Sequence, residues 1–229
     1  MESHLPFLDE LILVDNESTD KTKEICKNFK KRYPNKVKFF EYPYRVTPPS
    51  EKNKNIPSNS VNSLAYYYNW CFSKTKYSHV MKVDDDNFLI SEKMGKIREK
   101  ALSSKKYYNM YWWINLVKDK DWKIWILKWY EYSWKWWDHW IYPVSPFTYY
   151  LQWEYCEQFI NNLQYMRNWF SFFHLKFLKP NYWFHNLIWD SYQKWYESKI
   201  KKWEYEYDIE SFLWKNKDIN LNKYIKDVA

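Results

Sequence analysis

The sequence has a single glycine, Gly95, among its 229 residues. Ordinary usage near 7% would give about 16 glycines in a chain of this length. The missing glycines matter because tight turns normally use this residue wherever the backbone needs a positive φ. The usual glycine signals of turns and phosphate-binding loops are therefore absent, and a nucleotidyltransferase with a glycine-rich phosphate loop is excluded.

Cysteine and long apolar runs are also scarce. The three cysteines, Cys26, Cys71 and Cys156, are far apart and odd in number, which excludes a disulfide framework and a zinc finger. No run approaches about 18 apolar residues, and the N-terminus has no basic region followed by an apolar segment. We therefore expect a cytoplasmic protein with no spanning helix and no secretory signal.

Tryptophan is in excess, with 17 residues. Several stand where glycine would be ordinary: "KDKDWKIWIL" (118–127) has a hairpin pattern whose natural turn is Asp-Gly, and "YSWKWWDHW" (132–140) resembles a flexible loop. Some bacterial lineages translate UGA as glycine, whereas other codes translate it as tryptophan. We hypothesise that the chain is bacterial and that most tryptophans from Trp112 onward are glycines in the cell, with Trp70 a true tryptophan. The alternative is an aromatic-rich surface that binds sugar.

The formal net charge is +8, and the basic residues are scattered. The densest run, "KNFKKRYPNKVK" (27–38), is typical of a solvated helix end. Weak peripheral attraction to the anionic inner face of the cell membrane is the alternative. The basic residues form no stripe with interleaved aromatics, so we expect no nucleic-acid partner.

The first half alternates strands and helices. Apolar runs predict strands over 11–14, 36–43 and 77–83, and helical spacing predicts helices that begin near 18–20 and cover 61–74 and 91–102, with a loop over 46–60. This order predicts an α/β fold with a mostly parallel, Rossmann-like sheet flanked by helices. In such sheets ligands bind at the carboxyl ends of the strands, where Asp15 and the Asp84–Asp86 triplet lie.

The second half is predicted to be mixed. Residues 107–155 resemble β-hairpins, residues 146–159 a strand that passes into a helix, and residues 157–170 and 204–229 helices. With no repeat and no clear linker, we expect a single domain over 1–229. Its halves would be 1–105, which binds the nucleotide sugar, and 106–229, which faces the acceptor.

The triplet in "VMKVDDDNFLI" (80–90) carries the chemistry. Adjacent carboxylates repel each other unless a cation intervenes. Asp84 and Asp86 are two residues apart, so they point the same way on extended backbone. Oxygen ligands of this kind suit Mg²⁺ or Mn²⁺, which complete their coordination with water and substrate phosphates. A solvated loop or an acidic helix cap is the simpler interpretation.

Two segments carry a family resemblance. "LDELILVDNESTDKTKEICKNF" (8–29) resembles the strand and helix of family-two glycosyltransferases, and "YSHVMKVDDDNF" (77–88) resembles their DxD segment. The resemblance implies a nucleotide-diphospho-sugar transferase fold. It also implies that Asp15, with Asn16 beside it, faces the nucleoside, and that Asp84 and Asp86 bind the diphosphate through Mn²⁺ or Mg²⁺.

The sequence departs from the family at two points. Glu17 and Lys21 stand where the family commonly has glycines. Family members also begin with a further strand and helix, whereas only seven residues precede Leu8. We therefore expect the chain to lack that first strand, either because its start is assigned late or because it is a fragment.

A general base must accept the proton of the acceptor hydroxyl. "QWEYCEQF" (152–159) resembles the family's Glu-Asp segment if Trp153 is glycine, which makes Glu154 the first catalytic candidate. A helix-starting acid is the alternative for this residue. Asp138, in a loop that is able to fold over the site, is the second candidate.

A late histidine completes the metal shell in related transferases. "FFHLKFLKPNYWFHN" (172–186) offers His174 first and His185 second, with Lys176 or Lys179 available to a phosphate. A structural histidine is the alternative for each.

These residues together predict a metal-dependent glycosyltransferase that moves a sugar from a nucleotide-diphosphate donor to a glycan or lipid-linked acceptor. The resemblance implies transfer with inversion, and the expected product is a surface polysaccharide or a glycolipid. The alternative is a truncated or degenerate transferase that binds carbohydrate without catalysis.

The recoding hypothesis makes one direct prediction. The coding triplets of most tryptophans from Trp112 onward are expected to be UGA, with UGG at Trp70. Sequencing the gene checks this, and UGG throughout would contradict it.

Overall fold

The computed structural model describes residues 1–49, 51–103, 105–118, 123–127, 140–154, 156–175, 178 and 205–208. In chain order its elements are η1 (Leu5–Phe7), β1 (Leu11–Asp15), α1 (Thr22–Arg32), β2 (Val37–Glu41), η2 (Glu51–Asn55), α2 (Leu64–Phe72), β3 (His79–Met81), β4 (Asn87–Leu89), α3 (Ser91–Leu102), β5 (Tyr107–Lys118), β6 (Ile124–Leu127), β7 (Trp140–Pro143), β8 (Tyr149–Trp153), β9 (Cys156–Ile160), β10 (Gln164–His174) and β11 (Tyr205–Asp208).

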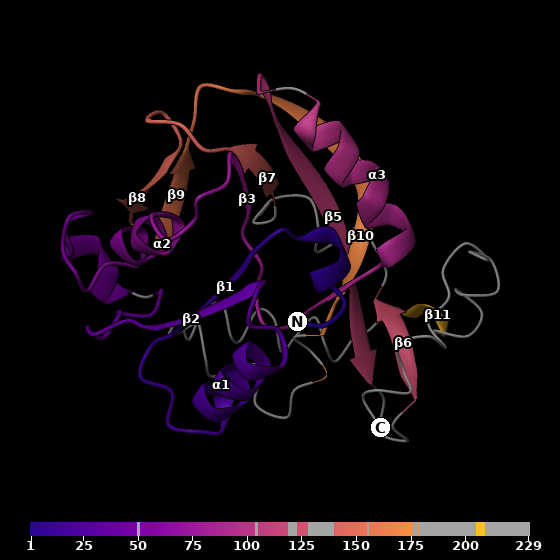
Figure 1. Ribbon diagram of the computed structural model, residues 1–229, viewed down its shortest axis with the longest axis horizontal. Helices are drawn as coiled ribbons and strands as arrows, with labels where there is room; N and C mark the ends of the chain where they lie inside the picture. The colour runs from indigo at the N-terminus through magenta and orange to yellow at the C-terminus, as the bar shows by residue number, and fades with distance from the viewer. Residues whose placement is uncertain are drawn as a thin grey trace.

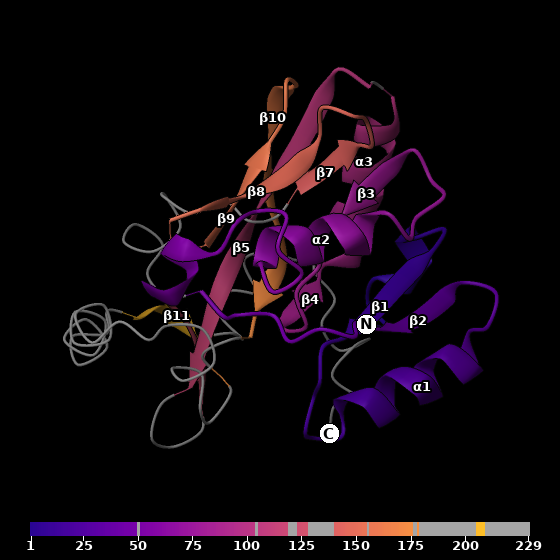
Figure 2. The ribbon, with the colours of Figure 1, turned by 90° about the vertical axis from the view of Figure 1, so that its left-hand side faces the viewer.

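The N-terminal part forms a small parallel layer. Strand β1 pairs with β2 in parallel, from Leu11 opposite Val37 to Asp15 opposite Glu41. The carboxylate of Asp20 accepts a hydrogen bond from the Thr22 amide at 2.9 Å, which favours the start of α1 at this point. Helix α1 lies along the β1–β2 layer (Figures 1 and 2), and a core cluster joins the two with η1 (Leu5, Phe29 and Val37). The predicted strand, turn and helix are confirmed.

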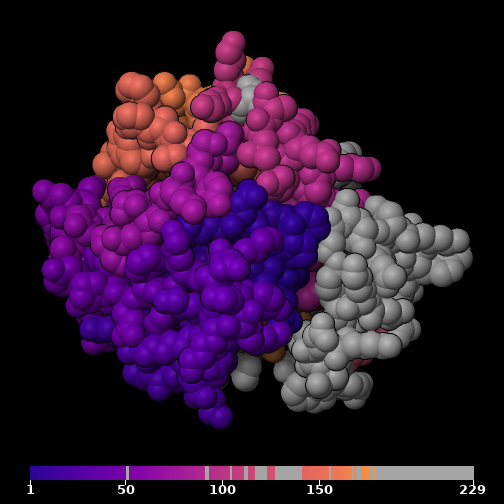
Figure 3. Space-filling view, in the orientation of Figure 1, coloured from indigo at the N-terminus to yellow at the C-terminus, as the bar shows by residue number. Residues whose placement is uncertain are grey.

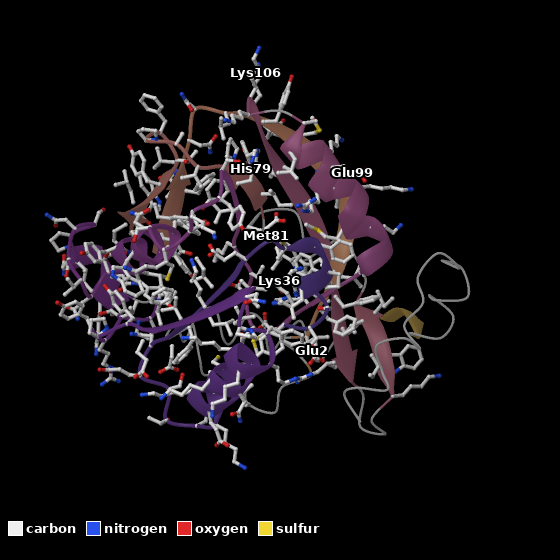
Figure 4. All side chains as sticks on the ribbon, viewed as in Figure 1. Glu2, Lys36, His79, Met81, Glu99 and Lys106 are labelled. Atoms are coloured by element: carbon white, nitrogen blue, oxygen red, sulfur yellow. The ribbon has the colours of Figure 1, made fainter. Side chains whose placement is uncertain are left out.

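The larger sheet has the order β11-β6-β5-β10-β4, with β7 beside β5 and β3 beside β7. The long strands β5 and β10 run parallel and side by side, and α3 covers one face of them (Figure 1). The core under α3 takes its side chains from the helix and from three strands (Leu89, Met94, Ile97, Ala101, Ile141 and Phe172). Glu99 on α3 and Lys106 beside β5 lie at the periphery (Figure 4).

The prediction of a mostly parallel sheet is not confirmed. Among the described strands, β1 with β2 and β10 with β5 are parallel, and the other pairings are antiparallel. Strand β1 pairs only with β2, and β3 pairs with β7. The two strands that precede the predicted carboxylates are therefore not hydrogen-bonded neighbours within the described part of the chain.

The predicted helix over 157–170 is wrong, and so is the passage from strand to helix within 146–159. These residues form the β8–β9 hairpin and the start of β10. The apolar residues Phe159, Leu163 and Met166 recur at helical spacing, but β9 pairs with β8 and β10 pairs with β5, and this pairing decides the structure. Phe172 and Phe173 are both buried, each in a different core cluster, because β10 is covered on both of its faces.

Helix α2 carries the β8–β9 hairpin on its surface. The Ser63 hydroxyl caps the helix by accepting a hydrogen bond from the Tyr66 amide at 2.9 Å. One turn later the Asn69 side chain binds both backbone groups of Tyr150, donating to its carbonyl and accepting from its amide, each at 2.8 Å. The Trp70 ring packs on Tyr42, with 5.0 Å between the ring centroids. Trp70 is thus a structural part of the core.

Two further segments were predicted, a hairpin around 118–127 and a helix over 204–229. The hairpin around 118–127 is confirmed by the antiparallel pairing of β5 with β6, although 119–122 lie outside the described residues. Of the helix predicted over 204–229, only 205–208 are described, and they form β11. In the described ranges, no helix combines the length and the apolar character that crossing a membrane requires.

Buried titratable side chains in and beneath α2 predict that the free energy of unfolding falls at alkaline pH. Burial raises the pKa of the Tyr42 hydroxyl to about 12, from an ordinary 10.0, and that of the Cys71 thiol to about 12, from 9.0. Between pH 9 and 12 the unfolded chain loses these protons before the folded chain does, so the free energy of unfolding falls as pH rises. Urea titrations across this window are expected to show the fall.

A double variant, Tyr42→Phe with Cys71→Ala, is expected to flatten that slope, because neither side chain then titrates. Tyr77→Phe, at an exposed position, serves as the matched control and is expected to leave the slope as it is. An equally steep slope in the double variant would contradict the assignment.

Candidate functional site

The aspartate triplet lies in the tight connection between β3 and β4. The Asn87 amide donates to the Asp84 carbonyl at 3.3 Å, which closes the turn. Asp84 and Asp86 are half-buried, while Asp85 is exposed. The two outer carboxylates are thus more shielded from water than the middle one, and they lie in a turn rather than on the extended backbone that the sequence suggested.

Strand β10 brings His174 to the triplet. Strand β4 pairs antiparallel with β10, with Asn87 opposite His174, and the Leu175 amide donates to the Asp86 carbonyl at 2.8 Å. This register sets His174 Nε2 at 3.3 Å from Asp86 Oδ1. On the other side of the ring, His174 Nδ1 lies 2.8 Å from Asn115 Oδ1 of β5. The His174 ring thus lies between an amide group and a carboxylate.

A buried lysine faces the other outer carboxylate. Lys82 is only 8% exposed, and its Nζ lies 3.7 Å from Asp84 Oδ1 and 3.7 Å from Glu157 Oε1 of β9. The same ammonium group lies 4.7 Å from the ring centroid of Tyr68 on α2. Burial raises the pKa of the Tyr68 hydroxyl well above its usual value, and Lys82 opposes that rise. A single cation thus joins residues of α2, β9 and the triplet.

Asp15 ends β1 in a buried position, 5% exposed, and its backbone carbonyl accepts a hydrogen bond from the Tyr42 amide at 2.8 Å. Its Oδ1 is buried, and no hydrogen-bond donor within the described ranges reaches it. A buried carboxylate oxygen costs free energy unless a ligand satisfies it. The position therefore fits a polar group supplied by a substrate.

The side chain of Asn16 is hydrogen-bonded to the protein's own backbone. Its Nδ2 donates to the Tyr44 carbonyl at 2.7 Å, and its Oδ1 accepts from the Val46 amide at 3.2 Å. The next residue, Glu17, is exposed and has φ of 54°. This left-handed conformation favours the glycine that the family commonly has there.

Of the remaining predicted residues, Glu154 is exposed, has φ of 34° and lies in the turn between β8 and β9. Asp138, His185, Lys176 and Lys179 lie outside the described residues. Within the described ranges, no group of three or more His, Cys, Asp or Glu side chains is arranged as a complete metal site. Asp86 and His174 are brought together, with Asp84 two residues away.

Sequence reasoning missed three residues of this site, Lys82, Asn115 and Glu157. Glu157 was not singled out, because the segment was wrongly predicted to form a helix with Glu154 at its start. Lys82 had a visible signal, because a lysine inside the otherwise apolar run "HVMKV" (79–83) must bury its charge beside an acid.

The described strands and helices form an α/β structure, and of the candidate carboxylates Asp15 ends β1 while Asp84 and Asp86 follow β3. The model of the family "Glycosyl transferase family 2" matches residues 4–158. The chain belongs to this family and is a glycosyltransferase, with the α/β fold of nucleotide-diphospho-sugar transferases that the family implies. No curated protein and no solved structure matches the chain significantly.

The turn after β1 makes a stability prediction. A residue with a Cβ loses roughly 1–2 kcal/mol in the left-handed region, and glycine loses roughly 0.5–1 kcal/mol of chain entropy on folding. Glu17→Gly is therefore expected to raise the free energy of unfolding by about 0.5–1 kcal/mol, measured by urea titration.

Glu24→Gly is the matched control, since Glu24 is equally exposed but lies in the first turn of α1. It is expected to lower the free energy of unfolding by up to about 1 kcal/mol. Equal signs for the two variants would show that the conformation at Glu17 is not strained.

Proposed function

We propose that this glycosyltransferase is metal-dependent and transfers a sugar from a nucleotide-diphosphate donor to an acceptor hydroxyl with inversion. The observation that carries the proposal is the contact between Asp86 and His174. Strand pairing brings an imidazole nitrogen within 3.3 Å of a carboxylate oxygen, and both groups are ligand types that bind divalent cations. These two groups, from different halves of the chain, form a place for such a cation.

The donor atoms suit a divalent cation. Asp86 and His174 would hold it, Asp84 would reach it directly or through its bound water, and Asn115 would orient the histidine ring from behind. Carboxylate and imidazole ligands fit Mn²⁺, and Mg²⁺ accepts the carboxylates. When bound, such an ion neutralises the charge that develops on a departing diphosphate.

Donor binding is assigned to the first half of the chain, residues 1–105. Asp15 would face the nucleoside, where its buried Oδ1 would accept a hydrogen bond from a base or ribose donor. Asn16 would act indirectly, because its side chain holds residues 44–46 beside the end of β1. The second half, 106–229, would supply the acceptor side.

The acceptor is proposed to be a glycan or a lipid-linked sugar, in the synthesis of a surface polysaccharide or glycolipid. The exposed basic residues Lys30 and Lys31, in the last turn of α1, support peripheral attraction to an anionic membrane at the inner face of the cell, since neither takes part in an ion pair within the described part of the chain. Residues of the first half cover most of the surface in Figure 3.

The proposal predicts joint binding of nucleotide and metal. Thermal melting with UDP, GDP, CDP or dTDP, each with and without Mn²⁺, is expected to show a shift of several degrees with one nucleotide only when the metal is present. A ligand at 100 times its dissociation constant stabilises a fold by about 2.7 kcal/mol. Asp86→Ala is expected to abolish the shift.

Asp85→Ala is the matched control, because it removes an adjacent carboxylate that is exposed. It is expected to keep the shift. If no nucleotide shifts the melting temperature of the unaltered protein, metal-dependent donor binding is wrong.

A further inference from the structure

We propose that Glu157 is the catalytic base that takes the proton of the acceptor hydroxyl, and that Lys82 is the positioning residue that fixes it beside Asp84. The inference deepens the proposed function and rests on it. It replaces the sequence-based choice of Glu154 with a residue on the next strand.

The environment of Lys82 supports this assignment. A cation that is only 8% exposed must be paired, because an isolated buried charge is costly. Its two carboxylate neighbours, Asp84 and Glu157, lie at the same distance of 3.7 Å, one from the donor half and one from the acceptor half. The lysine therefore constrains the separation of Asp84 and Glu157, with Glu157 on the acceptor-half side of the ammonium group.

The register of the β8–β9 hairpin also supports the assignment. Glu157 lies opposite Gln152, and Phe159 lies opposite Tyr150. Alternation along the strands puts these side chains on the face that packs toward α2, whereas Tyr149, Leu151 and Trp153 are on the exposed face. The side chain of Glu157 is 12% exposed, so it is screened from bulk water yet accessible.

The hairpin is itself held at several points. Asn69 of α2 binds the Tyr150 backbone at 2.8 Å in both directions, and the Gln152 amide donates to the Ser58 hydroxyl at 2.8 Å. Catalytic groups need such rigid support, since a small misplacement lowers the rate strongly. Glu154 lacks this support, because it lies exposed in the turn with φ of 34°.

The proposed step is a displacement at the anomeric carbon of the donor sugar. The acceptor O–H bond breaks, and its proton goes to the Glu157 carboxylate. The acceptor oxygen forms a bond to the anomeric carbon from the face opposite the diphosphate. The bond from that carbon to the diphosphate oxygen breaks, and its electron pair leaves with the nucleoside diphosphate. The proton on Glu157 is then lost to water.

The test measures release of nucleoside diphosphate from nucleotide-hexoses that carry the base identified by melting, with water as the acceptor probe. Glu157→Gln keeps the shape of the side chain and removes its basicity. It is expected to lower kcat by 100-fold or more, while KM for the donor and the nucleotide-induced melting shift stay within twofold. Glu154→Gln is expected to keep kcat within threefold.

Lys82 is tested by a pair of variants. Lys82→Met removes the cation and is expected to lower kcat at least tenfold, whereas Lys82→Arg, which keeps the charge, is expected to recover most of the loss. Glu99→Gln is the control for charge removal, because Glu99 is an exposed carboxylate on α3 that lies at the periphery of the molecule (Figure 4). Melting of each variant without ligand shows whether it folds.

The outcomes separate the two proposals. If the unaltered protein binds nucleotide and metal and turns over, but Glu157→Gln keeps its kcat or Glu154→Gln loses it, the assignment of Glu157 is overturned and the proposed function stands. If the unaltered protein neither binds nucleotide nor releases it from any donor, both are overturned.

Discussion

The pairing of β4 with β10 is the constraint on which the site depends. Strand β4 has only three residues, yet its register sets Asn87 opposite His174 and directs the Leu175 amide to the Asp86 carbonyl. A slip of one residue would turn the imidazole to the opposite face of the sheet. The parallel pairing of β10 with β5 then places Asn115 opposite the same histidine. Two ladders thus fix one ring between an amide and a carboxylate.

The strand pairing also determines how the negative charges of the triplet are balanced. Each of the two half-buried carboxylates faces a nitrogen group, Asp84 the ammonium of Lys82 and Asp86 the imidazole of His174, while Asp85 is left to water. Three adjacent negative charges would otherwise repel one another. The net charge of +8 plays little part in this, since distant exposed charges are screened by salt. Lys82 thus offsets the charge of Asp84, and the cation proposed between Asp86 and His174 would offset that of Asp86.

Local signals made part of this structure predictable. The run Leu11–Val14 followed by polar caps indicated β1 and α1, and Asp86 and His174 were both candidate ligands before the structure brought them together. The strands over 156–174 were not predictable, because their apolar spacing imitates a helix and only pairing with distant strands resolves it. Turn chemistry gave no help, since the positive φ angles fall on Glu17 and Glu154 in a chain with a single glycine.

The same error explains why the sequence favoured Glu154 over Glu157, the residue that we propose as the acceptor-side acid. In a helix, Glu154 would stand at the start of the first turn, where an acid is favoured by the helix dipole. In the observed hairpin it becomes an exposed turn residue, and Glu157 takes the inward position beside Lys82. Since Lys82 and Asp84 belong to the connection after β3, the lysine joins the two halves of the chain at the acid triplet. A transferase that must bring donor and acceptor together requires such a fixed junction, because the reacting atoms have to be held within a fraction of an ångström.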